Sequence, residues 1–463
     1  MAANQNVKEW ARKNFGDCQL GDKRRTERLM KVAEQVATNP SASFPNQMPG
    51  WSDLKAAYRL FDREDVTFSS IVGPHWRATC QRKQGRYLIL CDTTEIDFGL
   101  HRDVEDLAPL GNGTGRGFLL HNGLMVDANS EEIIGLAGQT IHYRKKAPKK
   151  ETNSQRMKRE RESKIWGDVV DAVGTPRDGV EFVHVCDRGG DNFELVCHFV
   201  QQRTDWVVRV SHMHRLVLTP GDEQVKLSEY LATLPVLETY ELELRARPHQ
   251  PSRVAKLEVR AGAIKLPVPR YRSQYVKDLA PPPIAMSVIE VREVDAPKGT
   301  KPIKWVLYTS LPATTFDETW RVIGYYEKRW LVEEFHKAYK TGCRVTGRQL
   351  KEAHRLEAAA GLMSVVAVRL LQLKSVARTD PQRPAKSVVP HLWLQMLNAV
   401  RKNLTRDHDL TVGQFYREVA KLGGFLGRKH DGQPGWITIW RGWEKLYTLV
   451  TAAELAMKLK RCG

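Results

Sequence analysis

Two aspartates follow short apolar runs that are typical of buried strands. Asp92 ends the run YLILCD, and Asp187 ends the run EFVHVCD. A carboxylate at the end of a buried strand is held rigidly by the sheet while its head faces the crevice in which α/β sheets bind their ligands. Either aspartate alone could equally be a turn-forming residue. The pair therefore predicts a site only if a further chemical group joins it.

A predicted helix in the segment RVIGYYEKRWLVEEFHKAYKTG, residues 321–342, supplies a third carboxylate. Successive helical residues are about 100° apart, so one face of this helix collects an aromatic ring, a carboxylate and two cations, at Tyr326, Arg329, Glu333 and Lys340. His336 and Lys337 flank that face, and Glu334 lies to one side of it. We therefore expect Glu333 to be the functional carboxylate. The alternative is a salt-bridged helix surface.

Three carboxylates on rigid elements of a basic protein predict a metal centre. Carboxylate oxygens bind divalent cations, and two such ions about 3.5–4 Å apart can promote in-line displacement at a phosphodiester. The basic side chains around Glu333 would then hold the phosphates of a DNA strand. The sequence thus predicts that one helix provides both a metal ligand and a phosphate clamp.

The composition favours a polyanionic partner. The 463 residues include 72 lysines and arginines against 54 acidic residues, a formal net charge of +18. This excess is typical of proteins that bind nucleic acid or an anionic membrane surface. The longest apolar run, AAAGLMSVVAV, is too short to span a bilayer, and no signal peptide is evident. Seven scattered cysteines without a CxxC pair favour a reducing compartment and no structural zinc. We therefore expect a soluble cytosolic protein.

The pattern along the chain predicts an α/β protein with helical ends. Helices are expected in residues 1–67, and alternating short strands and helices follow from Tyr87. Proline-rich turns between alternating strands predict an antiparallel β insertion at about 212–311. Helices are expected from about Phe316 to Leu373, with the segment 321–342 as a single helix among them, followed by a linker, KSVARTDPQRPAKSVVP, into a helical C-terminal region.

The spaced motif Y(2)R(3)E(6)K in the 321–342 helix resembles the signature of IS-four-type bacterial DDE transposases, those of the Tn-five type in particular. The resemblance includes CDTT around Asp92, VCDR around Asp187, GDKRRTERL and AAYRLF near the start, KWVLYTS before the helix, and LGGFLGRKHDGQPGWITIWRGWEKL near the end. It thus extends over essentially the whole chain, and both aspartates are in register with it.

The resemblance implies a ribonuclease-H-like mixed-sheet core at residues 68–373, interrupted by the β insertion. It also implies a helical domain that binds transposon ends at 1–67 and a helical dimerisation domain at 374–463. The metal ligands would be Asp92, Asp187 and Glu333, holding two Mg²⁺ ions, with Mn²⁺ as a substitute. The residues that contact DNA would be Tyr326, Arg329, Lys340, Arg209, Trp305, Arg24, Arg25, Arg28 and Arg59. Trp305 would stack on an extruded base, although a strand tryptophan is more often a core residue.

The expected activity is cut-and-paste transposition: nicking of transposon ends, formation and opening of a hairpin, and joining of the 3′-ends to target DNA. The partners would be double-stranded DNA and a second copy of the chain in a synaptic homodimer, in the bacterial cytoplasm at the nucleoid and without a membrane. A metal-dependent nuclease on the same fold, or an inactive DNA-binding relative, is the alternative.

Three features leave alternatives open. The loop at 143–164 is more basic than the family pattern predicts, and it either contacts DNA or is a disordered charged segment. Ser211 stands where the family pattern predicts a lysine. Trp436, Trp440 and Trp443 share a helical face, which indicates either a surface for pairing two transposon ends or an ordinary helix core.

Overall fold

The computed structural model describes residues 7–100, 104–111, 113–244, 251–400, 410–428 and 431–462. Its N-terminal helices are α1 (Val7–Phe15), α2 (Lys23–Thr38), α3 (Phe44–Gln47), α4 (Trp51–Phe61) and α5 (Phe68–Cys80). Helix α2 begins at Asp22, whose side chain accepts a hydrogen bond from the Arg24 amide, as an N-cap does. The buried face of α2 carries the apolar residues Leu29, Val32, Ala33 and Val36.

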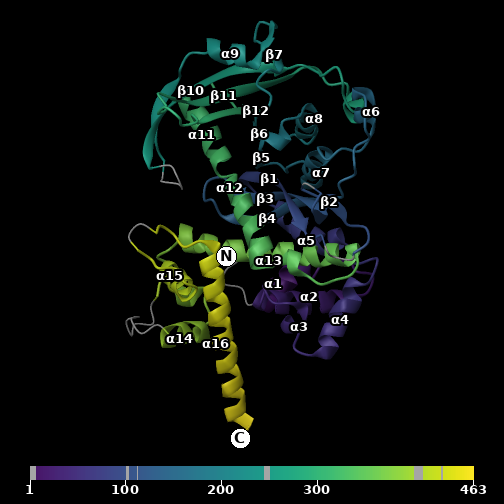
Figure 1. The fold of residues 1–463 in the computed structure, drawn as a ribbon, viewed down its shortest axis with the longest axis vertical. Helices are drawn as coiled ribbons and strands as arrows, with labels where there is room; N and C mark the ends of the chain where they lie inside the picture. The colour runs from purple at the N-terminus through teal and green to yellow at the C-terminus, as the bar shows by residue number, and fades with distance from the viewer. Residues whose placement is uncertain are drawn as a thin grey trace.

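A mixed sheet forms the centre of the molecule, and its first half carries the predicted aspartates (Figure 1). The strands are β1 (Gly85–Asp97), β2 (Ala108–Leu110), β3 (Gly115–Asp127), β4 (Ile133–His142), β5 (Val180–Cys186) and β6 (Asp205–Arg209). Strand β1 pairs antiparallel with β3 and parallel with β5, and β5 pairs parallel with β6. Strand β4 pairs with the far side of β3. The order across this half is therefore β4-β3-β1-β5-β6.

The predicted β insertion continues the same sheet. Its strands are β7 (Leu216–Leu218), β8 (Gln224–Lys226), β9 (Glu238–Leu244), β10 (Arg253–Leu266), β11 (Ile284–Val294) and β12 (Lys304–Thr309). All pairs among them are antiparallel, as predicted. Strand β12 also pairs with β6, with Leu307 opposite Arg209. The prediction treated β12 as part of a separate insertion, whereas it joins the insertion to the central sheet.

Helices cover both faces of the sheet because consecutive strand residues point to opposite sides. On β1, Ile89 and Cys91 pack with α7 (Lys164–Val173) and α8 (Phe193–Gln201). The alternate residues Leu88 and Leu90 belong to the larger core, which includes residues of α11, α12 and α13. The shorter helices α6 (Asn153–Lys158), α9 (Leu227–Thr233) and α10 (Gln274–Leu279) lie between strands along the chain.

The helices expected from about Phe316 to Leu373 are present, but the single helix predicted for residues 321–342 is interrupted, so that expectation is wrong. The region consists of α11 (Phe316–Glu327), α12 (Trp330–Lys337), a π turn (Ala338–Gly342) and, after a loop, α13 (Ala353–Thr379). Between α11 and α12 the amide of Val332 bonds the carbonyl of Arg329, three residues back, which tightens the turn there. The predicted linker from residue 374 is also wrong at its start, because α13 continues to Thr379 and only then reaches Pro381.

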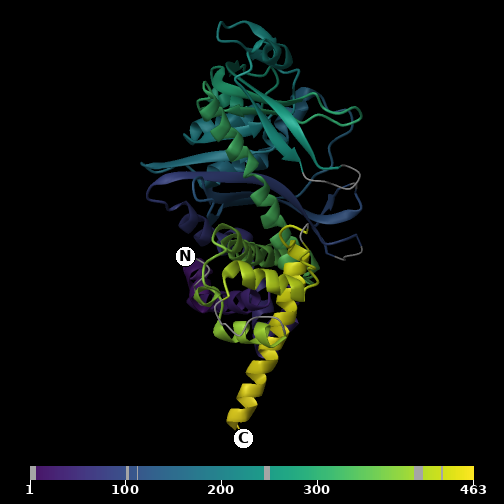
Figure 2. The ribbon, with the colours of Figure 1, turned by 90° about the vertical axis from the view of Figure 1, so that its left-hand side faces the viewer.

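Helix α13 is long enough to pass as a membrane span and contains a sufficiently apolar stretch of 18 residues, but 83% of that stretch is buried inside the protein. It lies between the sheet and the N-terminal helices in both ribbon views (Figures 1 and 2). It packs against α5, α2 and β4. Helix α13 is therefore the central core helix that joins the N-terminal helices to the sheet.

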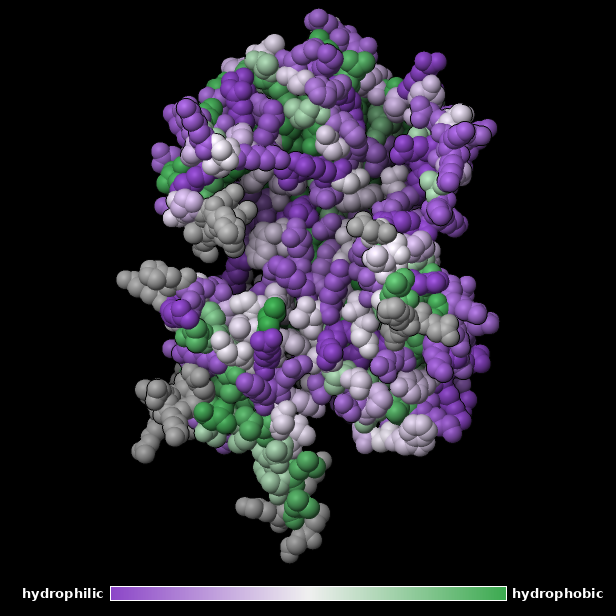
Figure 3. Space-filling model, viewed as in Figure 1, coloured by the Kyte–Doolittle hydropathy of each residue, from purple (hydrophilic) through white to green (hydrophobic). Residues whose placement is uncertain are grey.

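The C-terminal region contains α14 (His391–Val400), α15 (Val412–Leu422) and α16 (Trp436–Cys462). Trp436 and Trp440 are buried in the main core, and Trp443 contacts Trp393 at 4.8 Å between ring centroids. Of the two readings of these tryptophans, the structure favours the helix core. The far end of α16 projects from the body and carries the exposed apolar side chains Leu455, Met457 and Leu459 (Figures 1 and 3).

Candidate active site

Asp92 and Asp187 leave neighbouring parallel strands at the same level. Their preceding residues, Cys91 and Cys186, are partners in the β1–β5 ladder. Strand β1 continues past Asp92, whereas β5 ends, and Asp187 caps a short 3₁₀ turn, Arg188–Gly190. The carboxylate of Asp187 accepts a hydrogen bond of 2.7 Å from the amide of Gly189. The sheet therefore holds both aspartates at the carboxyl end of β5.

Arg329 links the first aspartate to the predicted glutamate. Its Nη1 lies 3.2 Å from Oδ2 of Asp92, and its Nη2 donates to Oε1 of Glu333. The side chains of Asp92 and Arg329 are 18% and 17% exposed, whereas that of Glu333 is 48% exposed. Glu333 thus stands at the rim of the site and Asp92 in its floor. The neighbouring Glu334 is buried and binds other partners, Lys337 and Lys374.

Asp92 lies close to other carboxylates in a site that is largely shielded from solvent. Burial raises the pKa of Asp92 to about 6, the charge of Asp187 adds to the rise, and Arg329 opposes it. Burial lowers the pKa of Lys340, while the charges of Glu95, Asp92 and Asp97 act against that shift. Cations therefore stabilise this end of β1.

The three predicted metal ligands are near one another without forming a closed cage. Among the described residues, the single group of three acidic, histidine or cysteine side chains with ligand atoms all within 4.8 Å is Asp62, Glu352 and His354. That group is at the surface, and Asp62 and Glu352 each pair with Arg355. Asp92 and Glu333 are bridged by a guanidinium instead. In this arrangement Arg329 supplies the positive charge that two carboxylates of the predicted triad share.

The predicted DNA contacts near the helix form a second cluster. Nη1 of Arg209 lies 3.4 Å from the hydroxyl of Tyr326, and its guanidinium carbon is 5.9 Å from the centre of that ring. The ring of Trp305 is 6.1 Å from the same tyrosine. Trp305 is half-buried, so one part of its indole packs on the core and another reaches solvent. An aromatic and guanidinium surface thus adjoins the carboxylates.

Three of the four predicted N-terminal arginines already have acidic partners. Arg24, Arg25 and Arg28 pair with Asp22, Asp65 and Asp53. Arg59 is exposed at the end of α4, and no ion pair with a described carboxylate involves it. Arg59 therefore differs from the other three arginines, whose charges are already paired with carboxylates within this helical region.

A buried polar chain behind Asp92 was missed by the sequence analysis. Nδ1 of His336 faces Oδ2 of Asp92 at 4.0 Å, and Nδ2 of Asn122 lies 3.0 Å from Nε2 of His336. Because an amide NH₂ can only donate, Nε2 accepts and the proton is on Nδ1. Asn122 in turn accepts from Gln139, which accepts from Ser364 of α13.

Burial lowers the pKa of His336 to about 3, so the imidazole is neutral and its Nδ1–H group faces Asp92. Polar residues inside the apolar strands GFLLHNGLMV and EIIGLAGQTI were the available signal for this chain. The chain fixes the orientation of His336, and through it the surroundings of Asp92.

Two family comparisons match the two ends of the chain. Residues 7–66, which contain α1 to α4, match the family described as transposase DNA-binding. Residues 365–463, from within α13 to the end of the chain, match the transposase Tn5 dimerisation domain. Because both terminal regions match transposase domains, we identify the chain as a Tn5-like transposase that binds DNA and dimerises.

Proposed function

We propose that the protein is a cut-and-paste DNA transposase with a ribonuclease-H-like catalytic core. It would nick transposon ends, form and open a hairpin, and join the 3′-ends to target DNA in the bacterial cytoplasm. The observation that carries the proposal is the linkage of Asp92 to Glu333 through Arg329, beside Asp187 on the neighbouring strand. The domains would be residues 1–67, 68–373 and 374–463.

The strand order supports the ribonuclease-H-like core. A meander of three antiparallel strands, β1, β3 and β4, is extended by two parallel strands, β5 and β6, on the other side of β1. Ligands of such α/β sheets bind at the carboxyl ends of parallel strands. Asp187 follows the carboxyl end of β5, and Asp92 lies beside it.

The donor set fits a divalent metal, since it offers carboxylate oxygens in a place where burial and a second acid raise the pKa of Asp92. Asp92, Asp187 and Glu333 would hold two Mg²⁺ ions, or Mn²⁺. When bound, these ions would supply Lewis-acid stabilisation of charge on the attacking and leaving oxygens. Arg329 would have to release Asp92 and Glu333 first, and a DNA phosphate is the natural acceptor for its guanidinium.

The chain's own residues would orient the strands. Lys340 and Arg329 would hold phosphates of the cleaved strand, and Arg209 with Tyr326 would hold the next part of the transposon end. Water would attack the scissile phosphorus and free a 3′-hydroxyl. That hydroxyl would attack a phosphodiester of the opposite strand, form a new ester bond that closes the hairpin, and release the 3′-oxygen of the flanking DNA. A second water would open the hairpin. Trp305 would stack on a base extruded at the turn, and the exposed end of α16 would pair two copies of the chain.

The test is incubation with linear DNA that carries the repeats flanking the protein's own gene, with Mg²⁺, followed by separation of nicked, hairpin and joined products. Asp187→Asn and Glu333→Gln should abolish all three products while end binding persists. Asp178→Asn is the matched control, because Asp178 lies before the opposite end of β5.

If Asp187→Asn kept normal turnover, the assignment of the triad would be wrong. A wild-type protein that nicked DNA but never joined strands would be a nuclease, the first alternative. A wild-type protein that bound ends without any cleavage would be an inactive relative.

A further inference from the structure

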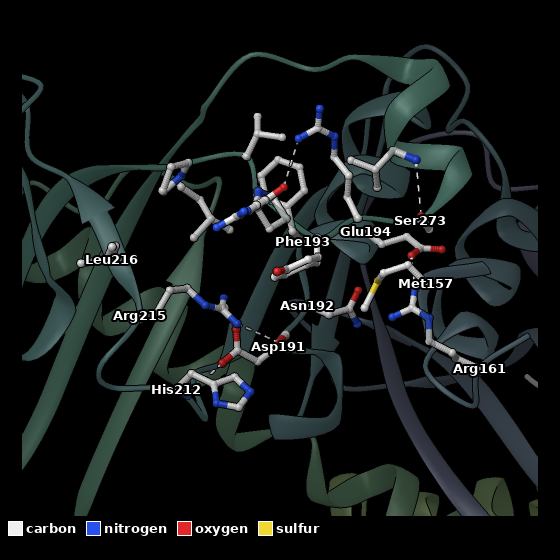
Figure 4. A pocket seen from close by; sticks show the side chains of 18 of the residues that line it. Met157, Arg161, Asp191, Asn192, Phe193, Glu194, His212, Arg215, Leu216 and Ser273 are labelled. Atoms are coloured by element: carbon white, nitrogen blue, oxygen red, sulfur yellow. Dashed lines mark hydrogen bonds and ion pairs between the residues drawn. The ribbon is translucent and has the colours of Figure 1, made fainter. Parts of the chain in front are cut away.

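A cavity of about 620 Å³ lies on the α8 side of the sheet, outside the carboxylate cluster. Figure 4 shows Asn192, Phe193 and Glu194 at its centre, with Arg215 on one side and Arg161 on the other. The loop after β10, residues 267–273, provides another wall. The volume falls within the range of roughly 300–1,000 Å³ that ligand sites have. It is large enough for a nucleotide.

Four arginines line the cavity, and carboxylates of the described residues pair with two of them. Arg215 pairs with Asp191 at 2.5 Å, and Arg161 pairs with Glu194 at 2.7 Å. Arg270 and Arg272 also line the cavity, and neither forms an ion pair with a carboxylate in the described part of the chain. Among the residues that the structure describes, Arg272 donates only to the carbonyl of Pro269, at 3.2 Å. Two arginines in excess over the acids predict an anionic ligand.

An aromatic ring and a free donor accompany these cations. Tyr271 is 48% exposed between the two arginines, and the guanidinium of Arg270 lies 5.5 Å from the centre of its ring. The side chain of Asn192 accepts from the amide of Leu195 through Oδ1, while its Nδ2 is buried without a partner among the described residues. A flat ring, two guanidinium groups and a spare amide donor suit a nucleotide better than an inorganic anion.

The cavity is built onto the same segments as the candidate active site. Asp191 follows Asp187 by one 3₁₀ turn. Its Oδ2 accepts from the amide of Ser211 at 2.7 Å and from the hydroxyl of Ser211 at 2.9 Å, two residues after Arg209. Ser211, at the position where a lysine was expected, therefore ties the end of β6 to the cavity wall. A strand that passes Asp187 and Arg209 is led towards Arg215 and Tyr271.

We propose that this cavity binds a nucleotide of a single DNA strand, with its phosphate held by Arg270 and Arg272 and its base stacked on Tyr271. The inference rests on the proposed strand-transfer function, because hairpin opening and joining leave unpaired nucleotides beside the carboxylates. Stacking on Tyr271 requires an unpaired base, so the site selects single strands over duplex.

The test measures binding of a labelled single-stranded oligonucleotide to the full chain by fluorescence anisotropy, without divalent metal, over a range of salt. Replacing both arginines, Arg270→Ala with Arg272→Ala, should weaken binding about tenfold or more and lower the salt slope by about 0.7, the value for the one phosphate that they hold. Tyr271→Ala should weaken binding by roughly 5- to 100-fold, and Tyr271→Phe should restore it. Arg177→Ala, an exposed arginine before β5, is the matched control.

An abasic strand gives the sharpest comparison, because it keeps the phosphates and removes the bases. It should bind the wild type weakly and be indifferent to Tyr271→Ala. The proposal is overturned if the double arginine variant, folded as judged by an unchanged thermal midpoint, binds the oligonucleotide as the wild type does. It is also overturned if the variants weaken duplex and single strand equally. The arginine and tyrosine variants are compared by binding without metal, whereas Asp187→Asn is tested by cleavage in Mg²⁺, so a failure of this site and a failure of the catalytic assignment give different results.

Discussion

The carboxylate of Glu334 accepts a hydrogen bond from the indole Nε1 of Trp436, 102 residues further along the chain. Lys374 of α13 binds the same carboxylate and lies 4.3 Å from the centre of the Trp436 ring. Trp436 is the first residue of α16, and Glu334 directly follows Glu333 on α12. The C-terminal helix is thus fastened to the helix that carries the predicted catalytic glutamate.

Trp436→Phe should lower the free energy of unfolding by roughly 1.5–3 kcal/mol, because a buried charged acceptor loses its donor. Urea denaturation followed by fluorescence measures this change. Trp440→Phe is the matched control, since the indole nitrogen of Trp440 is buried without a partner among the described residues. Equal losses in the two variants would mean that the bond to Glu334 contributes nothing beyond ring volume.

The sequence analysis placed the strands that lead to the two aspartates better than it placed the helix boundaries. Asp92 and Asp187 follow apolar strands, which is a local pattern, and the structure has both strands side by side. The same reasoning ran one helix through residues 321–342, because the tight turn at Arg329 and the π turn before Cys343 leave the 3.6-residue periodicity nearly unchanged. Such interruptions of a helix depend on which backbone hydrogen bonds form, and the spacing of apolar residues in the sequence does not show that.

Contacts between distant segments were beyond reach of the sequence. Nothing near Asn122 indicates that it meets His336, 214 residues away, or that Arg329 bridges Asp92 and Glu333. The helical wheel put Arg329 and Glu333 on one face and left a salt bridge along the helix as the alternative to a DNA contact, but it said nothing of Asp92, the second acidic partner. Such pairings depend on how the sheet and α12 pack together, and a single sequence carries no record of that packing.

Arg329 should couple metal binding to DNA binding. In the absence of DNA its guanidinium neutralises Asp92 and Glu333, so divalent ions compete with it. Arg329→Ala should therefore bind Mn²⁺ about tenfold more tightly than wild type without DNA, a gain of about 1.4 kcal/mol, yet cleave transposon ends more slowly. Isothermal titration with Mn²⁺ and a cleavage assay measure the two effects. Weaker metal binding in the variant would contradict the competition.

Trp305→Ala should leave the first nick largely intact and slow hairpin formation, so that nicked DNA accumulates. Extruding a base costs a few kcal/mol, and stacking on an indole returns roughly 1–3 kcal/mol. Trp305→Phe should be milder because an aromatic face remains beside Tyr326. Quenched time courses resolve the two steps. If both steps slowed equally, or if the variant unfolded, Trp305 would be a core residue only.

Arg59 should contribute more to DNA binding than its ion-paired neighbours. It is the predicted end-binding arginine for which no carboxylate in the described ranges is a partner, so a phosphate need not displace one. Arg59→Ala should weaken binding of the transposon end and lower the salt slope by about 0.9. Arg25→Ala, which breaks the pair with Asp65, should change the slope less and stability more. Gel shifts at several salt concentrations test this order.

His75 connects the N-terminal helices to the sheet through a fixed tautomer. Its Nδ1 lies 2.7 Å from Oδ1 of Asn14 on α1, and the amide of Leu136 on β4 donates to its Nε2 at 3.0 Å. A carboxamide oxygen can only accept, so Nδ1 carries the proton and Nε2 is the acceptor. If Nε2 were protonated, its N–H group would face the N–H group of Leu136, and neither donor would have an acceptor. Burial, helped by the charge of Lys13, accordingly lowers the pKa of His75 to about 4.

This shift predicts that stability falls in mild acid. Between pH 6.5 and about 4 the unfolded chain binds a proton at this residue and the folded chain does not, so the free energy of unfolding decreases as pH falls through that window. The loss should reach roughly 3 kcal/mol at pH 4, and above pH 6.5 His75 should have no effect. In His75→Gln, whose amide can still donate and accept, urea denaturation at pH 7.0, 5.5 and 4.5 should show a pH slope smaller by about one proton. His336 should still contribute to the remaining slope, because its pKa is also lowered, to about 3. An unchanged slope would mean that His75 is already accessible to protons in the folded protein.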